Sequence, residues 1–452
     1  MNPDIDHSPE VCARVARRIL PALALLYVFS SLDRANVGFA APQMNADLGF
    51  DPAVYGFGVG IFFVGYLALQ LPSVWLLKRI GARLWITGTV VLWGIIATLG
   101  VAIHDQGSFY LNRLLLGMAE AGFAPGMTYY ISRWLPSAYR GRAMGFTMLS
   151  VPVSMMIGGP LSGALLSFHP LGLAGWRWMF LVEGLPPLLL GLFAFAWFQD
   201  EPDKATWLTQ NQRQWIAAVL AKEDADARQG ARSGSQLNWM LSRRVWTYAL
   251  IWFTFTGGSY GLMYWLPETL HRSGIHSAQL IGLLTVAPWA GVAAGMILNG
   301  RHSDLTGERI WHLAGAALLG AVALLATIMT PIGWPALLLL SLSGLGMGGA
   351  LGLFWSLPSR DFSHQGPNAF AVINMLGNTS GAVLPALIGL ILARTGHIFL
   401  PVVLTSGLLA LGGVMIAVAK VGGRPSAEPS RRPTSIQRAS VAPEIEPAQP
   451  GG

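Results

Sequence analysis

The chain has 452 residues, of which 53% are hydrophobic and only 11% are charged, against about 25% charged residues in soluble domains. This shortage of charge excludes an ordinary soluble enzyme. The formal net charge of +7 does not indicate a nucleic-acid-binding protein, because long apolar runs separate the arginines. The one cysteine, Cys12, excludes a disulfide within the chain and a thiolate metal cluster.

Apolar runs of about 20 residues, the length that crosses a bilayer as an α-helix, follow one another along the chain. We predict spans at 19–41, 53–76, 84–102, 108–131, 143–167, 178–198, 245–267, 278–299, 310–330, 334–358, 367–393 and 397–420. The first run follows three arginines, but it is too long for a signal-peptide core and contains charge, so we expect it to be a retained span. The sequence predicts an all-α integral membrane protein.

The spans fall into two groups of six, which predicts two helical bundles at 19–198 and 245–420. The polar linker 199–244 joins them, and a capping box of Thr209 and Gln212 predicts an interfacial helix within it. Residues 1–18 form a short N-terminal segment. Residues 421–452 are rich in Pro, Ser, Glu and Arg and are expected to be disordered.

The distribution of Lys and Arg predicts the orientation, because cytoplasmic flanks hold the excess of these residues. With both termini inside, 24 of the 29 lie on the cytoplasmic side of the predicted spans, three lie outside (Arg177, Arg272 and Arg394) and two lie within spans. This distribution accounts for the basic net charge without a nucleic-acid partner.

The two halves resemble each other. Gly117-Met118-Ala119-Glu120 in the fourth span parallels Gly346-Met347-Gly348-Gly349 in the tenth. Gly and Pro also recur at the same 19-residue spacing, as Gly141 with Pro160 and as Gly366 with Pro385. Duplicated six-span bundles are typical of secondary transporters.

Four charged residues lie deep in predicted spans, namely Asp33, Arg34, Arg113 and Glu120. Each costs about 2.5 to 3.5 kcal/mol at the centre of a span, so each needs a partner or a water-filled cavity. Arg113 and Glu120 are seven residues apart, which places both on one helix face. We therefore expect all four to line one cavity.

Two interpretations of these charges are open: ion pairs that only join two spans, or a transport site. The second half carries Gly349 where Glu120 would recur, and this asymmetry favours a transport site. Arginine matches a substrate carboxylate, and a protonated acid no longer competes for that arginine. Protonation and anion binding then assist each other, which is proton symport. Glu120 and Asp33 are the candidate proton carriers, since no histidine lies in the middle of a predicted span.

Other polar groups at membrane depth have two interpretations, helix-to-helix hydrogen bonding or contact with a ligand. They include Tyr66, Trp355, Asn374 and Asn378. We expect Glu183 to reach toward the membrane surface or to pair with Arg177. The chain has no Gly-Lys-Ser/Thr phosphate loop, so ATP-driven transport is not indicated.

Several blocks of the sequence resemble the anion:cation symporter family of the major facilitator superfamily, in the branch of bacterial tartrate, phthalate and 4-hydroxyphenylacetate permeases. They are Leu32-Asp33-Arg34-Ala35-Asn36, Gly117-Met118-Ala119-Glu120-Ala121-Gly122, Gly175-Trp176-Arg177-Trp178 and Glu183-Gly184-Leu185-Pro186. The resemblance extends over nearly all of residues 14 to 420. It implies the major facilitator fold, with twelve transmembrane helices in two pseudo-symmetric bundles.

The resemblance also implies roles for individual residues. Arg34 would bind the substrate anion, Asp33 and Glu120 would couple protons, and Arg113 would organise them. Tyr66, Trp355 and an asparagine of the eleventh span, Asn374 or Asn378, would line the site. The loop with Gly300, Asp304, Gly307 and Arg309 is similar to the superfamily's cytoplasmic gating motif, whereas the first-half loop has Lys78 where that motif has Asp.

We therefore expect a monomeric, proton-coupled importer of a small organic anion in the cell inner membrane, with no cofactor and no metal ion. An anion exchanger or an efflux antiporter of the same fold is the alternative. A membrane-embedded enzyme is disfavoured, because the spans hold no nucleophile with a positioned base and no metal cluster. A sensor is disfavoured, because the linker and the tail are too short or too disordered for a folded signalling domain.

Overall fold

The computed structural model describes residues 8–231, 242–331, 333–362 and 367–419, and most of these residues are helical. The first half contains α1 (Ser8–Leu48), α2 (Pro52–Ile80), α3 (Ala82–Thr98), α4 (Gln106–Glu120), α5 (Phe123–Trp134), α6 (Ser137–Met148), α7 (Ser150–Leu166) and α8 (Gly175–Trp197). After α9 (Gln210–Ala231), the second half contains α10 (Arg243–Arg272), α11 (Ala278–Thr306), α12 (Ile310–Ala326), α13 (Trp334–Phe354), α14 (Ser356–Asp361), α15 (Pro367–Thr395) and α16 (Phe399–Val418). The predicted fold class is confirmed. The expected disordered tail, 421–452, lies outside the described residues.

Ten helical segments are long and apolar enough to cross a membrane. The other two predicted spans correspond to α4 followed by α5, and to α10. The first is a broken helix, and α10 carries charged residues at both ends. With these two, the chain has the twelve crossings that the sequence predicts. The helix α1 begins before residue 19, the predicted start of the first span, and Val11 and Val15 continue its buried face.

The fourth crossing breaks directly after Glu120, at Ala121 and Gly122. The Trp85 indole of α3 packs against this break and donates a hydrogen bond of 3.0 Å to the carbonyl oxygen of Gly122. A Cβ on Gly122 would lie 2.4 Å from the Trp85 ring, so only glycine fits at this position. The break therefore sets the depth at which Glu120 ends α4.

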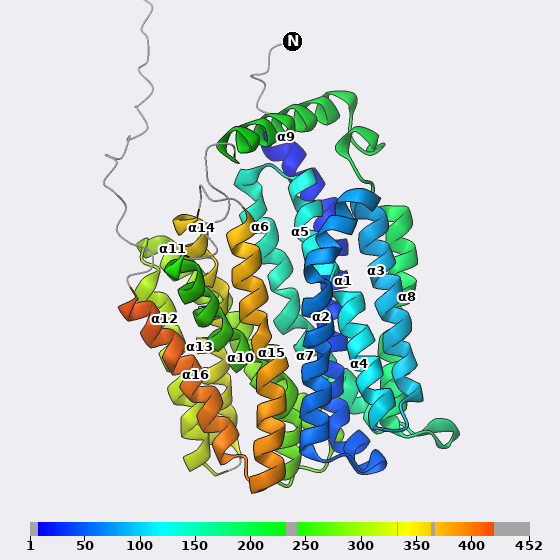
Figure 1. The fold of residues 1–452 in the computed structure, drawn as a ribbon, viewed down its shortest axis with the longest axis vertical. Helices are drawn as coiled ribbons and strands as arrows, with labels where there is room; N and C mark the ends of the chain where they lie inside the picture. Colours follow the sequence, from blue (N-terminus) through cyan, green and yellow to red (C-terminus); the bar gives the residue numbers. More distant parts are fainter. Residues whose placement is uncertain (1–7, 232–241, 332, 363–366, 420–452) are drawn as a thin grey trace, which may run out of the picture.

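One end of the bundle is marked by α9, which lies across it in Figure 1. We call this the α9 end. The predicted Thr209–Gln212 capping box is present at the start of α9. Glu223 of α9 accepts hydrogen bonds from the backbone N–H of Ser137, at 2.9 Å, and from Arg140, at 2.8 Å. These contacts attach α9 to the first half of the molecule.

The two halves contact each other toward the opposite end. Tyr55 of α2 donates a hydrogen bond of 2.9 Å to the carbonyl oxygen of Tyr264 on α10. Gly159 of α7 and Gly282 of α11 lie so close that a Cβ on Gly282 would be 2.1 Å from the Gly159 carbonyl oxygen. Figure 1 shows α2 beside α15, the other main contact between the halves. The described structure is therefore packed shut at the opposite end.

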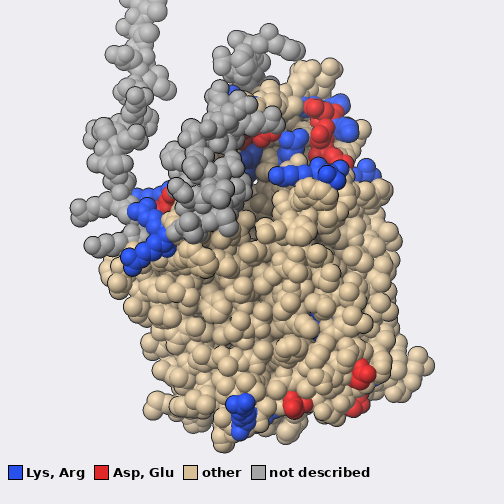
Figure 2. All heavy atoms as spheres, viewed as in Figure 1, with Lys and Arg blue, Asp and Glu red and all other residues tan. Residues whose placement is uncertain are grey.

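Charge is distributed unevenly along the long axis. Figure 2 shows Lys and Arg gathered at the α9 end, a wide middle band almost without charge, and few charged side chains at the opposite end. An uncharged band of this kind is what a bilayer requires of the protein surface that faces it.

Candidate functional site

An ion pair between α1 and α4 forms the centre of the candidate site. Arg34 Nε lies 2.6 Å from Glu120 Oε2, and Ser30 Oγ donates to the same oxygen at 3.2 Å. Ser30 and Arg34 are four residues apart, which places both on one face of α1. Glu120 is fully buried, and its second oxygen has no hydrogen-bond partner among the described residues. The fold therefore brings together Arg34 and Glu120, two of the predicted site residues.

Aromatic rings of α2 lie against Arg34 and Arg113. The Arg34 guanidinium lies 5.0 Å from the ring centroid of Tyr66, and the Arg113 guanidinium lies 4.8 Å from that of Phe62. Both distances are those of cation–π contacts, which stabilise a charge that is partly or fully removed from water. Tyr66 thus lies against Arg34, the residue predicted to bind the anion.

Access to solvent separates Arg34 from the other three deep charges. Its side chain is 15% exposed, whereas Asp33 and Glu120 are fully buried and Arg113 is 1% exposed. Arg34 is therefore the one of the four whose side chain is partly exposed, and the expectation that all four line one cavity stays a prediction.

Asp33 and Arg113 lie behind this pair. Neither oxygen of Asp33 has a hydrogen-bond partner among the described residues, and the same is true of two nitrogens of Arg113. Asp33 lies within electrostatic range of Arg113, Glu120 and Glu183. The first half therefore encloses a group of charges larger than one ion pair.

The partner of Glu183 differs from the predicted one. It is 1% exposed, and it accepts a hydrogen bond of 2.7 Å from Ser162 of α7 rather than pairing with Arg177. Arg177 instead donates to the carbonyl oxygen of Val101 and stacks on Trp176. The expected pairing is wrong because α7 packs against the buried face of α8, a contact that sequence spacing does not reveal.

The predicted residues of the second half form two groups. Asn378 donates to Asn374 at 3.1 Å and accepts from Tyr260 at 3.1 Å. Trp355 instead packs against Trp252 and Phe370 within the second half. The contacts of Trp355 thus do not join it to the asparagines or to Arg34.

Two tyrosines near Arg34 were not predicted as site residues. Tyr27 and Tyr260 both lie within electrostatic range of Arg34, and the Tyr260 ring is 4.7 Å from Phe63 of α2 across the contact between the halves. Tyr27 could have been found, since it precedes Arg34 by two helical turns. Tyr260 has no comparable signal in the sequence.

The second-half loop that carries the predicted gating motif lies at the end of α11. Asp304 and Arg309 form an ion pair, and Arg309 also donates to Ser303 at 3.0 Å. Gly307 has a φ of 70°, which favours glycine at the helix end, and Gly300 has open space around it. The loop is therefore closed on itself by the residues that the motif predicts.

Glu308, within the same loop, directly precedes Arg309, the N-cap residue of α12, and its side chain caps the first turn of that helix. Partial burial opposes its ionisation, but hydrogen bonds from the backbone N–H groups of Trp311 and His312 and from the His312 ring outweigh it and hold the pKa of Glu308 below its usual value. The carboxylate thus stays ionised and stabilises the first turn of α12.

The first-half loop uses a different acid. Asp200, which follows α8, accepts a hydrogen bond of 2.9 Å from the backbone N–H of Arg83, and Arg83 Nε donates to the carbonyl oxygen of Phe195. The loop that has Lys78 in place of the motif's Asp is thus connected to the end of α8.

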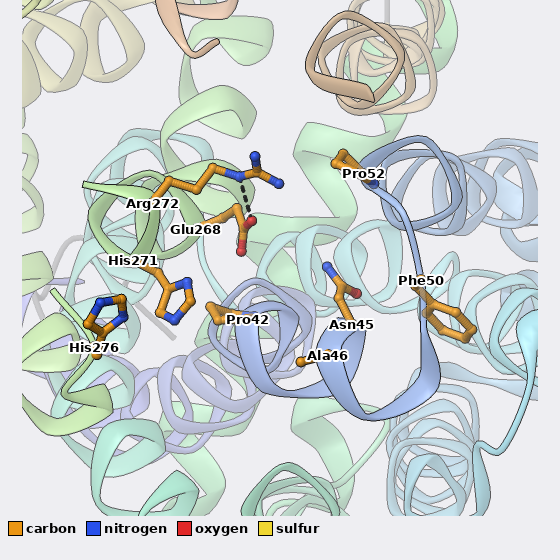
Figure 3. A pocket seen from close by; sticks show the side chains of 9 residues that line it. All are labelled: Pro42, Asn45, Ala46, Phe50, Pro52, Glu268, His271, Arg272 and His276. Carbon is orange, nitrogen blue, oxygen red and sulfur yellow. Dashed lines mark hydrogen bonds and ion pairs between the residues drawn. The ribbon is translucent and has the colours of Figure 1, made fainter. Parts of the chain in front are cut away.

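A separate cavity of about 410 Å³ lies at the opposite end, between α1 and α10. Figure 3 shows Asn45 on one side of it and the ion pair of Glu268 with Arg272 on the other, with two histidines at its edge. It contains none of the predicted site residues. Among the described ranges, no three His, Cys, Asp or Glu side chains are grouped so that they could hold a metal ion.

Comparisons with known proteins extend over most of the chain. The family model described as Major Facilitator Superfamily matches residues 23–385. A protein of Agrobacterium vitis named "Putative tartrate transporter" is 40% identical over 423 residues, which are 92% of this chain and 96% of that protein. The "Quinolone resistance transporter" of Acinetobacter baumannii is 38% identical, covering 90% and 95% of the two chains. A solved D-xylose-proton symporter, 15% identical, has the same fold, with a TM-score of 0.71 and coverage of 88% and 97%.

Proposed function

The chain belongs to the Major Facilitator Superfamily, whose members here are multi-pass membrane transporters and not enzymes, and we propose that it imports a small organic anion together with protons. The observation that carries this proposal is the partly accessible Arg34, held by a buried acid. The relative named "Putative tartrate transporter" supports a carboxylate as the substrate class.

The anion binds at the free edge of Arg34. Glu120 occupies Nε, while Nη2 is buried and has no hydrogen-bond partner among the described residues, so it is left with an unused N–H donor for an anion. A guanidinium presents its donors as a planar fork, which matches the two oxygens of a carboxylate. Tyr66 lies against the guanidinium and limits the direction from which the anion approaches.

Proton coupling follows from competition between two carboxylates for Arg34. An ionised Glu120 holds the guanidinium at 2.6 Å, whereas a protonated Glu120 has no charge with which to hold it. Protonation of Glu120 therefore frees Arg34 for the substrate, and bound substrate in turn favours protonated Glu120 by the same factor. Asp33, enclosed with Arg113, is the second proton site.

Alternating access uses the two bundles, 19–198 and 245–420, as units that rock around this site. The α9 end carries most of the Lys and Arg, so we assign it and both termini to the cytoplasm, and the linker 199–244 lies on that side. The halves are packed together at the opposite, outer end. This geometry corresponds to a conformation closed to the outside.

The test is uptake of radiolabelled tartrate by the purified monomer in proteoliposomes with a proton gradient, acid outside. We expect accumulation that a protonophore abolishes. Arg34→Ala should abolish uptake and tartrate-induced thermal stabilisation, whereas the exposed control Arg142→Ala should not. Glu120→Gln should retain tartrate counterflow and lose gradient-driven accumulation, with the exposed Asp203→Asn as its control.

Two outcomes contradict parts of the proposal. Accumulation that a protonophore leaves unchanged removes the proton coupling. Thermal stabilisation of Arg34→Ala by tartrate equal to that of the wild type removes the anion site. If tartrate fails to stabilise the wild type, a thermal-shift screen of aromatic and sugar acids identifies the probe, and the same variants are then compared with it.

The alternative is an exchanger or efflux antiporter of the same fold. The "Quinolone resistance transporter", 38% identical, favours export as the second candidate. Preloaded vesicles distinguish the two, because exchange requires an anion on the far side and symport does not.

A further inference from the structure

A basic pocket lies at the α9 end, away from the Arg34 site. It has a volume of about 570 Å³ and is lined by Glu10, Ala13, Arg14, Arg17, Arg18 and Trp197. The first five residues belong to the start of α1, and Trp197 is the last residue of α8. Three guanidinium groups from one helix and an indole from its neighbour therefore share one cavity.

The length of α8 indicates where this pocket lies relative to the bilayer. This helix has 23 residues, which at 1.5 Å per residue is about 34 Å, close to the thickness of a bilayer's hydrocarbon core. Its last residue, Trp197, therefore lies at the membrane interface, where tryptophan is enriched. The Trp197 indole donates a hydrogen bond of 3.2 Å to the carbonyl oxygen of Arg18, which places the arginines at headgroup level.

The arginines are not neutralised by acidic side chains within the described part of the chain. The Arg18 guanidinium lies 4.0 Å from the Trp197 ring centroid, and its Nε is buried without a hydrogen-bond acceptor. Arg14 has one hydrogen bond, of 3.3 Å, to the uncharged Gln212. The pocket contains one carboxylate, Glu10, against three guanidinium groups. It therefore has excess positive charge and several N–H donors for an anion.

An apolar strip leads from the bilayer to this pocket. Phe193 stacks on Trp197 with 5.6 Å between ring centroids, and Leu189 lies one helical turn further along α8. Phe193 is 58% exposed and Leu189 is 64% exposed, at a depth where the surface faces lipid. A molecule with a charged group and an attached acyl chain matches both parts of this surface.

We propose that this pocket binds the phosphate group of an anionic phospholipid from the leaflet at the α9 end, with an acyl chain along Leu189 and Phe193. Guanidinium groups hydrogen-bond phosphate oxygens in a forked geometry, and the cation–π contact of Arg18 with Trp197 fixes one guanidinium in place. Inorganic phosphate has the same anionic chemistry, but it would leave the exposed strip without a role. The continuity of strip and pocket therefore favours the lipid.

The test is native mass spectrometry of the full chain, titrated in detergent with dioleoyl phosphatidylglycerol, and with dioleoyl phosphatidylcholine as the neutral comparison. The triple variant Arg14→Gln, Arg17→Gln, Arg18→Gln should bind phosphatidylglycerol about a hundredfold more weakly, since each arginine near an anionic lipid contributes about fivefold. The matched control, Arg142→Gln, Arg243→Gln, Arg244→Gln, removes three exposed arginines from the same end and should bind like the wild type.

A double variant and two competing ligands test the site and the lipid assignment separately. If the triple variant does not fold, the double variant Arg14→Gln, Arg17→Gln leaves Arg18 on Trp197 and should still bind at least tenfold more weakly. Equal losses in the variant and its matched control would overturn the site, because the effect would then be one of net charge. Displacement of the lipid by inorganic phosphate at the same concentration would overturn the lipid assignment, as would equal binding of phosphatidylcholine.

Discussion

Replacement of Gly282 by valine should force the two halves apart at the end opposite α9, which we propose is the outer end. In the described conformation a Cβ at this position would lie 2.1 Å from the Gly159 carbonyl oxygen, whereas ordinary Cβ contacts begin at 3.4 Å. The α7 and α11 backbones must therefore separate by at least about 1.3 Å, and by more for the valine methyl groups. Neither backbone can yield as a flexible side chain would.

The expected size of the shift follows from the cost of overpacking. Forcing extra methyl groups into a packed contact costs about 1 to 3 kcal/mol. If this cost is confined to the conformation closed at the outer end, the ratio of outer-closed to outer-open molecules falls about 5-fold to 150-fold. Gly407→Val is the matched control, because no heavy atom lies within 4 Å of a Cβ at Gly407.

The assay measures the distance between nitroxide labels on two exposed outer-end positions. Gln106→Cys labels the first half and His397→Cys labels the second, in a Cys12→Ala background that removes the one native cysteine. We expect Gly282→Val to add a population at longer distance and Gly407→Val to leave the distribution unchanged. An unchanged distribution in folded Gly282→Val would refute our reasoning that the glycine contact limits closure.

Three further expectations concern single interactions. Glu308→Ala should destabilise the protein by about 1 kcal/mol, because the first turn of α12 loses its cap. The pKa of Glu308 is lowered in the folded state, so this contribution is present above the unfolded pKa and disappears as the pH falls through the folded pKa. The melting temperatures of the variant and the wild type should therefore converge in acid. Ser162→Ala should lower stability by about 1 to 3 kcal/mol, because it leaves Glu183 without its one described hydrogen bond, and an unchanged melting temperature would contradict that burial. Glu223→Ala should speed hydrogen exchange in α9 while sparing α10, and equal protection would show that other contacts hold α9.

The succession of apolar runs of about 20 residues predicted the all-helical fold, because a bilayer permits few alternatives to the helix. The same physics predicted that Arg34 and Glu120 meet, since an isolated charge in a span is costly. The break after Glu120 could not be predicted, as it depends on Trp85 from another helix. Glu183 was placed wrongly for the same reason: its partner, Ser162, is set by packing between helices.

The deep charges of the candidate site all come from α1 and α4, while the contacts that join the halves at the outer end involve glycines, aromatic rings and the Tyr55 hydrogen bond. The energetic cost of dehydrating Asp33 and Arg113 is thus met within the first bundle, when it folds and inserts. The second bundle moves against an almost neutral surface, so the rate of rocking should depend on shape and contact area more than on salt concentration.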